Sequence, residues 1–323
     1  MSGFRLSPAS ARLALHPGLI LALLALQFVV PPFHRALLTQ VLVFGTYAGG
    51  YNLLLGYSGL MSLGHAMFFA AGMYATGLTV YYFRLGASEA FLFGIAASGA
   101  LATLMGVITL RTRGVSFLIA TLLFAQVFYL STLYFNRITG GDQGLVLTGR
   151  LRPLHIATVD VALSNSVLKY NAALAVFALC LLLTLWLIRS PVGRVLVAVR
   201  ENEERTRMLG YNTFRYKLLA FALSGGISGM AGSVYTLLFS YLGSSFASIL
   251  YSIYPLLWTL LGGVGTAVGP LVGTTVMTYV VDTASGLTDS YLIVVGAALI
   301  VVIMKFPAGL MGGIRARWLP WLP

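Results

Sequence analysis

The segment YKLLAFALSGGISGMAGSVYTLLFSYL, residues 216–242, contains a single charged side chain, that of Lys217. A helix of this length rises about 40 Å, whereas the hydrocarbon core of a bilayer is about 30 Å thick. The segment is therefore predicted to cross a membrane as a helix.

The rest of the chain has the same character. Of its 323 residues, 59% are apolar and 9% are charged, and the mean hydropathy is +0.91. Soluble domains are about 45–50% apolar and about 25% charged. The apolar surface exceeds what one core can bury, so lipid is the expected solvent. We predict an all-α membrane protein, a polytopic bundle of about 8–10 transmembrane helices that forms one domain over residues 1–323.

Ten apolar windows are candidates for crossing helices. Two of them, 248–263 and 266–283, are short and interrupted by glycine, so either could be a broken or re-entrant helix. The first window is followed by PPFHR and not by a small-residue cleavage pattern, so it is predicted to be a retained span. The windows cover residues 15–33, 36–55, 65–83, 88–110, 115–135, 168–188, 216–242, 248–263, 266–283 and 288–305.

The distribution of basic residues predicts the orientation. If the N-terminus is cytoplasmic and every window crosses, fourteen of the 20 Lys and Arg residues lie inside and six lie outside. Cytoplasmic loops of membrane proteins carry the excess of basic residues, so both termini are predicted to be cytoplasmic. Two hydrophilic segments result, an external loop at about 136–167 and a cytoplasmic loop at 189–217.

Several function classes are disfavoured by the motifs. The sequence has no phosphate-binding G-x-x-x-x-G-K-[ST] loop and no nucleophile elbow, and its four histidines lack metal-ligand spacing. We therefore expect neither an enzyme nor a bound cofactor or metal. The net charge of +12 is spread between apolar runs without stacking aromatics, which argues against nucleic acid.

The acidic residues bear on the energy source. Outside residues 200–210, all of them fall in external loops or at the ends of spans. Ion-coupled transport commonly uses carboxylates inside the membrane. Their placement counts against an ion-coupled secondary transporter or channel, which is kept as the alternative from a different class.

Glycines mark the segment GYSGLMSLGHAMFFAAGMYATG, residues 56–77. A break in a helix leaves backbone groups that are tolerated in a membrane only beside protein or a water-filled path. Candidates for lining a translocation path are Gly56, Ser58, Gly59, Ser62, Gly64 and His65.

Two further glycine series are predicted to allow close helix packing in lipid. Each series places its glycines on one helical face. The series are Gly225, Gly229 and Gly232, and Gly265, Gly269 and Gly273.

The segment RENEERTRMLG, residues 200–210, holds six of the 28 charged side chains. Ser190 and Pro191 form a helix-start pattern, with serine as the N-cap and proline in the first turn. Gly210 is a plausible end. One helix is therefore predicted to run from Pro191 to Gly210.

Two Glu-before-Arg pairs at i,i+4 support this helix, Glu201 with Arg205 and Glu203 with Arg207. Each contributes only about 0.2–0.5 kcal/mol, which keeps the segment helical in water without explaining its presence. It is either a solvated connector or a helix that docks on a soluble partner. Apolar residues that suit a groove on a partner are Val195, Val197, Val199 and Met208.

With these segments, the sequence closely resembles LivM-type permeases, the transmembrane subunits of branched-chain amino acid ABC importers. The similarity runs from about residue 40 to 310 and follows the family's order of landmarks. The matching segments are GYSGLMSLGHAMFFAAGMYA (56–75), RTRGVSFLIATLLFAQV (111–127), TGGDQGL (139–145), GRVLVAVRENEERTRMLGYNTFRYKLLAFALSGGISGMAGSVY (193–235) and LLGGVGTAVGPLVGT (260–274).

The resemblance implies a role for the cytoplasmic segment. In such importers a cytoplasmic helix fits into a cleft of the ATPase subunit, and the family's alanines after the glutamate are replaced here by Arg205 and Thr206. The positions that match the family pattern are Glu203, Glu204 and Gly210, flanked by Arg200, Glu201, Arg205 and Arg207.

The resemblance also implies the partners and the location. We expect a second, LivH-like permease subunit, two ATP-binding subunits that hold ATP and magnesium, and a periplasmic solute-binding protein, all at a bacterial inner membrane. In the external loop, Gly140, Gly141 and Asp142 either dock the binding protein or cap the spans. Alternating access driven by the partner ATPase would pass branched-chain amino acids, with urea, short-chain amides or other amino acids as alternatives.

Overall fold

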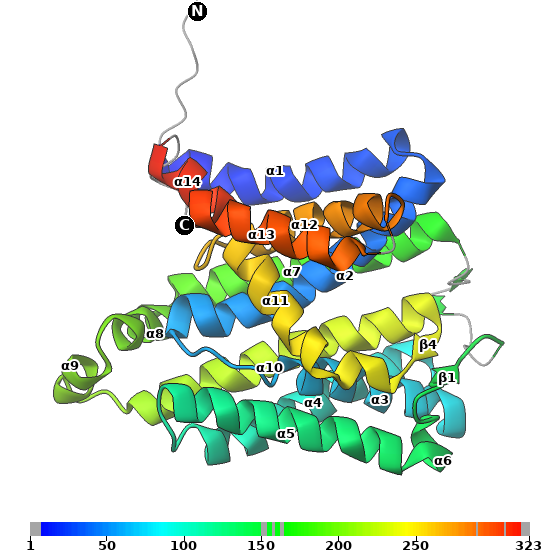
Figure 1. Cartoon of the computed structure of the whole chain (residues 1–323), viewed down its shortest axis with the longest axis horizontal. Coiled ribbons are helices and arrows are strands. Elements are labelled where there is room, and N and C mark those ends of the chain that lie inside the picture. Colours follow the sequence, from blue (N-terminus) through cyan, green and yellow to red (C-terminus); the bar gives the residue numbers. More distant parts are fainter. Residues whose placement is uncertain are drawn as a thin grey trace, which may run out of the picture.

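The computed structural model describes residues 8–149, 154–156, 159–161, 165–288, 290–306 and 308–317. Over these residues the chain is a bundle of α-helices, numbered α1 to α14, with four short strands (Figure 1). The predicted all-α membrane fold is confirmed.

Each of the ten apolar windows coincides with one helix. By length and composition, four helices in the described part of the chain are long and apolar enough to cross a membrane: α4, α5, α7 and α10. The ten helices are α1 (Pro8–Val29), α2 (Pro32–Asn52), α3 (His65–Phe83), α4 (Ala87–Thr109), α5 (Val115–Tyr134), α7 (Ser166–Arg189), α10 (Thr213–Phe239), α11 (Ile249–Gly262), α12 (Gly269–Ser285) and α13 (Tyr291–Lys305).

Shorter elements connect them. The helical ones are a π-helix η1 (Leu53–Tyr57), α6 (Asn136–Thr139), α8 (Pro191–Glu201), α9 (Glu203–Met208), a 3-10 helix η2 (Ser244–Ala247) and α14 (Gly309–Arg317). Strand β1 (Leu145–Val146) pairs antiparallel with β4 (Tyr241–Leu242), and β2 (Leu154–Ile156) pairs with β3 (Val159–Val161). The β1–β4 ribbon joins the loop that follows α6 to the connection between α10 and α11.

Helix α10 is the centre of the bundle. Buried residues make up 72% of its apolar window, against 22% in α4 and in α5, so those two helices leave most of their apolar windows exposed on this chain. Helix α10 packs against α2, α3 and α4. A Cβ at Gly229 would overlap Ser98 of α4, and one at Gly232 would overlap the Phe69 carbonyl of α3. The predicted packing role of this glycine series is confirmed.

The second glycine series was predicted to lie on one helical face, and this prediction is wrong for Gly265. Gly269 and Gly273 pack against α11, where a Cβ would overlap the carbonyls of Gly263 and Trp258 respectively. Gly265 instead lies in the turn before α12, with φ +72°. The three glycines are spaced by four residues, but α12 starts at Gly269, four residues after Gly265, so Gly265 lies outside the helix.

Helix α11 is short and interrupted. Its 14 residues rise about 21 Å, less than the thickness of the hydrocarbon core, so it cannot cross alone. Pro255 lies inside it and lacks the N–H that would bond to the carbonyl of Tyr251. The hydroxyl of Tyr47 on α2 donates to that carbonyl at 2.7 Å, which satisfies it and ties α2 to α11.

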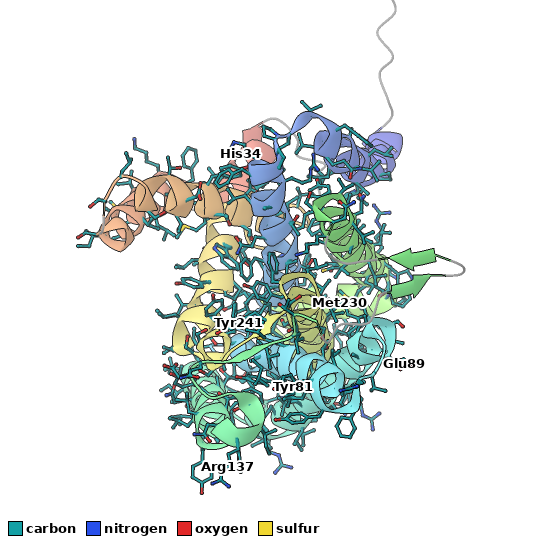
Figure 2. All side chains as sticks on the ribbon, turned by 90° about the vertical axis from the view of Figure 1, so that its right-hand side faces the viewer. His34, Tyr81, Glu89, Arg137, Met230 and Tyr241 are labelled. Atoms are coloured by element: carbon teal, nitrogen blue, oxygen red, sulfur yellow. The ribbon has the colours of Figure 1, made fainter. Side chains whose placement is uncertain are left out.

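The two ends of the bundle carry different elements. Helices α8, α9 and α14 lie at one end, together with the start of α1 (Figure 1). The β1–β4 ribbon and α6 lie at the other end, onto which Figure 2 looks, with Arg137 and Tyr241 labelled. The same view shows α12 and α13 projecting to one side of the bundle.

Candidate functional site

In the loop predicted to be cytoplasmic, helix α8 begins as predicted after the N-cap Ser190. Its hydroxyl accepts a hydrogen bond from the Gly193 N–H at 3.2 Å, and Pro191 occupies the first turn of α8. Helix α8 is amphipathic and buries Val195, Leu196 and Val199 against its own bundle. The interpretation that Val195 and Val199 face a partner's groove is therefore wrong.

The predicted single helix is also wrong, because it breaks at Asn202. This residue has extended backbone angles, φ −160° and ψ 101°, and its side chain accepts from the Arg205 N–H at 2.9 Å. It is thus the N-cap of a separate helix, α9, whose first turn holds Glu203 and Glu204. Across the break, Glu201 does not pair with Arg205; it binds Arg200 at 2.6 Å.

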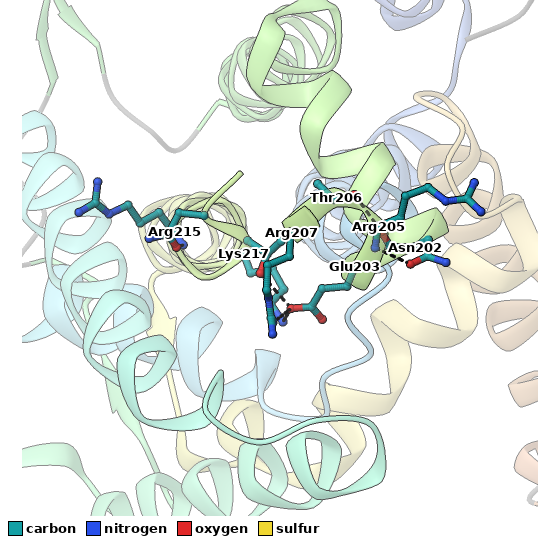
Figure 3. Close-up of polar contacts among 9 residues, drawn as sticks. Asn202, Glu203, Arg205, Thr206, Arg207, Arg215 and Lys217 are labelled. Atoms are coloured by element: carbon teal, nitrogen blue, oxygen red, sulfur yellow. Dashed lines mark hydrogen bonds and ion pairs between the residues drawn. The ribbon is translucent and has the colours of Figure 1, made fainter. Parts of the chain in front are cut away.

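Glu203 holds α9 to the bundle (Figure 3). Its Oε1 accepts from Lys217 Nζ at 2.8 Å, Thr213 Oγ1 at 3.1 Å and Arg207 Nη2 at 3.3 Å. The predicted pair of Glu203 with Arg207 is confirmed. Partial burial would raise the pKa of the carboxyl, but the hydrogen bond and charge of Lys217, with Thr213 and Arg113, lower it overall. Glu203 is therefore a charged anchor at neutral pH.

The tip of the loop faces solvent. Met208 and Leu209 are 86% and 71% exposed, although both are apolar. Glu204, Arg205 and Arg207 are exposed beside them. Gly210 has φ +89°, a conformation that favours glycine, and it turns the chain toward α10. An exposed apolar pair beside charged side chains is typical of a surface that binds another protein.

Arg200 connects this loop to the break in α2. Its Nη1 donates to the carbonyl oxygen of Gly56 at 2.5 Å. Gly56 lies in η1, the π-helical end of α2, where carbonyls lack intrahelical partners. Gly59, with φ +72°, lies so close to Arg200 that a Cβ would come within 2.8 Å of its Cγ. Two sets of residues that the sequence predicted separately thus meet.

Asn52 extends the connection from Arg200 and Gly56 to the turn before α12. The sequence did not predict a role for it. Its Nδ2 donates to the Thr266 carbonyl at 3.0 Å, and its Oδ1 accepts from the Gly265 N–H at 2.9 Å. The side chain is fully buried beside Gly56, where a Cβ would overlap it. An asparagine within an apolar helix, just before a glycine-rich break, was the signal available.

The other candidates near the break are interior. Ser58 Oγ donates to the Leu54 carbonyl at 2.6 Å, and Ser62 Oγ accepts from the Gly64 N–H at 3.1 Å. His65 is fully buried, with its Nε2 2.8 Å from Ser224 Oγ. Since the Ser224 hydroxyl donates to the Gly50 carbonyl at 2.6 Å, His65 Nε2 is the donor to Ser224. These contacts fasten the start of α3 to α10 and α2.

At the opposite end, the glycines of the loop that follows α6 form a tight turn. Gly140 and Gly141 have φ of +78° and +56°, and the Gly141 N–H donates to Thr139 Oγ1 at 3.2 Å. The loop is then held by β1, where the Leu147 N–H donates to the Ser240 carbonyl at 2.8 Å. Asp142 is exposed at the turn. The glycines therefore end α6 in a tight turn that leaves Asp142 exposed.

Comparisons with known proteins point to transport. Residues 34–303 match a family described as the permease component of branched-chain amino acid transport systems. The chain is similar to the high-affinity branched-chain amino acid transport system permease protein LivM of Salmonella typhimurium, at 26% identity over 91% of this chain and 73% of the relative. It is also similar to LivM of Escherichia coli, at 29% identity over 68% of this chain and 56% of the relative. No solved structure matches the chain.

Proposed function

Because this chain belongs to the permease-component family of branched-chain amino acid transport systems, we propose that it is the membrane subunit of an ATP-driven importer of branched-chain amino acids. It is a multi-pass membrane protein of transport type and not an enzyme. In the proposal it works at a bacterial inner membrane with a second, LivH-like permease subunit. Two ATP-binding subunits and an external solute-binding protein complete the complex.

The observation that carries the proposal is the contact of Arg200 with Gly56. Energy from ATP hydrolysis on a partner must reach the spans through a physical connection. The exposed tip formed by Met208 and Leu209 supplies a docking surface, and Glu203 fastens it to α10. Arg200 then joins the same loop to the discontinuity in α2. Displacement of the loop by a partner would thus be transmitted to α2 and, through Asn52, to the turn before α12.

The same arrangement supports a proposed orientation. The loop, the start of α1 and the end helix α14 share one end of the bundle (Figure 1). In the proposal this end is cytoplasmic, as the bias of basic residues predicts. The opposite end, with Asp142 and the β1–β4 ribbon, faces the external binding protein.

Cysteine cross-linking tests the docking and the orientation together. The one native cysteine, Cys180, is buried and competes little for reagents. Met208→Cys is expected to cross-link to the ATP-binding subunit in membranes. The matched control is Val146→Cys, 60% exposed on β1 at the other end, which is expected to cross-link only to the external binding protein. Cross-links from Val146→Cys to the ATP-binding subunit would reverse the orientation and refute the docking assignment.

Reconstitution tests the energy source and the solute. Liposomes with the whole complex are expected to take up radiolabelled leucine when ATP is supplied, and not urea. Liposomes with this chain alone are expected to show neither ATP hydrolysis nor uptake. Uptake by the chain alone under an ion gradient would instead establish the secondary transporter or channel.

A further inference from the structure

A cavity of about 220 Å³ lies between α2, α11, α12 and α13. One wall is aromatic: the rings of Tyr254 and Trp258 stack with centroids 5.8 Å apart, and Phe44 lies 5.4 Å from Trp258. The facing wall is aliphatic and includes Met277 and Val281 of α12. The cavity thus offers ring faces on one side and aliphatic groups on the other.

The polar groups of the cavity restrict what it can hold. Among the described side chains that line it, none is charged, and the hydrogen-bonding groups are those of Gln40, Thr278, Tyr251, Tyr254 and Trp258. A solute with net charge would therefore lie in a membrane protein without a counter-charge, which is costly. A zwitterion is net neutral: its ammonium group can lie over an aromatic face, and its carboxylate can accept from an amide.

The groups that line the cavity also favour amino acids over urea. Urea has no apolar group, so it would gain nothing from the ring faces and aliphatic side chains that also line the cavity. The side chains of valine, leucine and phenylalanine gain from contact with such walls. The lining therefore favours an amino acid with an apolar side chain.

The position of the cavity suits a site along a crossing path. Gln40 and Phe44 each lie eight residues from an end of α2, Pro32 and Asn52 respectively, which is about 12 Å of helix. The cavity is thus at mid-depth. It also adjoins α11, whose backbone is interrupted at Pro255.

We infer that this cavity holds the side chain of the solute during its passage, and that the size of the cavity sets the preference between large and small apolar side chains. The inference rests on the proposed importer function and locates the site that selects among its solutes. The cavity lies away from the coupling contacts of Arg200, so its variants leave the coupling loop intact.

The test changes the size of the cavity in both directions. Val281→Phe fills it and Trp258→Leu enlarges it. Uptake of phenylalanine and of alanine is measured in the reconstituted complex at concentrations that saturate one external binding protein, so that protein's preference cancels between variants. The phenylalanine-to-alanine ratio is expected to fall about tenfold or more in Val281→Phe and to rise about tenfold or more in Trp258→Leu.

A matched control is Val301→Phe, the same change on α13 at a side chain that is 51% exposed and outside the cavity. It should leave the ratio unchanged. A milder pair, Val281→Leu and Phe44→Leu, is used if the larger changes prevent folding, and opposite shifts of the ratio are again expected.

The outcomes distinguish an error in the cavity assignment from an error in the proposed importer function. Normal leucine uptake with a ratio within twofold of the unchanged protein in all cavity variants would overturn the cavity assignment and leave the importer standing. An equal shift in Val301→Phe would overturn it as well. Failure of the unchanged complex to take up any amino acid would refute the proposed function itself.

Discussion

The carboxylate of Glu203 lies 2.8 Å from the ammonium group of Lys217, and the lysine side chain is only 7% exposed. The pair joins the short, exposed helix α9 to the first turn of the central helix α10. A cation this deeply buried depends on its partner, because removing the carboxylate leaves an uncompensated charge.

Glu203→Ala is therefore expected to lower the free energy of unfolding by up to about 3 kcal/mol. Adding Lys217→Met should recover at least about 1 kcal/mol, because it removes the stranded charge. Glu204→Ala, at the exposed neighbouring position, should change stability by less than about 0.5 kcal/mol. Thermal unfolding of the purified chain in detergent measures all three, and additive losses in the double variant would contradict the pairing.

The lowered pKa of Glu203 sets a pH dependence. Its contribution to stability is fully present above the ordinary carboxyl pKa of 4.5 and is lost as pH falls through the lower pKa of the folded state. A spin label at Met208→Cys should therefore stay restricted at pH 5 and become mobile only at more acidic pH. Glu203→Gln should show mobility that does not change in that range. A loosening that occurs instead between pH 6 and 7 would point to another group.

Arg200→Ala is expected to uncouple the complex. The charged hydrogen bond to the Gly56 carbonyl contributes about 1.5–3 kcal/mol, so its loss should lower transport per ATP hydrolysed roughly tenfold or more. Docking should persist, because the tip at Met208 is unchanged. Arg194→Ala removes the same charge from an exposed position on α8 and serves as the control. Parallel loss of ATP hydrolysis and transport in Arg200→Ala would show that it acts on docking instead.

Gly232→Ala tests the close approach of α3 and α10. The added methyl would overlap the Phe69 carbonyl, so the helices must separate, at a cost of about 1–3 kcal/mol. Gly226, in the same helix, has no atom within 4 Å of an added Cβ. Gly226→Ala should be neutral or slightly stabilising, because alanine favours helix. Melting temperatures of the two variants give the comparison, and equal values would refute the packing argument.

Tyr47→Phe should leave the Tyr251 carbonyl without a partner, at a cost of about 1–3 kcal/mol. Pro255→Ala restores an N–H that can bond to this carbonyl within α11. The double variant should therefore unfold at a higher temperature than Tyr47→Phe alone. A neutral Tyr47→Phe would mean that the carbonyl is satisfied in another way.

Elements with a strong local signal were predictable. The apolar window 65–83 coincides with α3, and window 115–135 matches α5 to within one residue. The start of α8 followed from Ser190 and Pro191, whose capping roles depend only on neighbours in the chain. Each of these features is fixed by hydrophobic length or by contacts within one turn.

Features that depend on distant contacts could not be read from the chain. Asn202 fits either a helix interior or a cap, and the Glu-before-Arg spacing favoured the interior, although Glu203 and Glu204 directly after an asparagine also match a helix start. Val195 and Val199 gave no sign of whether the bundle or a partner covers them. Asn52 acts on residues more than 200 positions away, so nothing local predicts its partners.

Arg200 recognises position 56 through a main-chain oxygen, an atom that every residue possesses. Position 56 is distinguished by the lack of room for a side chain, since a Cβ there would come within 2.6 Å of the Gly265 N–H nitrogen. The receiving side of the contact is thus defined by the lack of a side chain. Segment 203–210 and the Arg200 contact are consequently separate parts of the protein. A loop grafted from a related permease could change which ATPase binds, provided that it keeps an arginine at position 200.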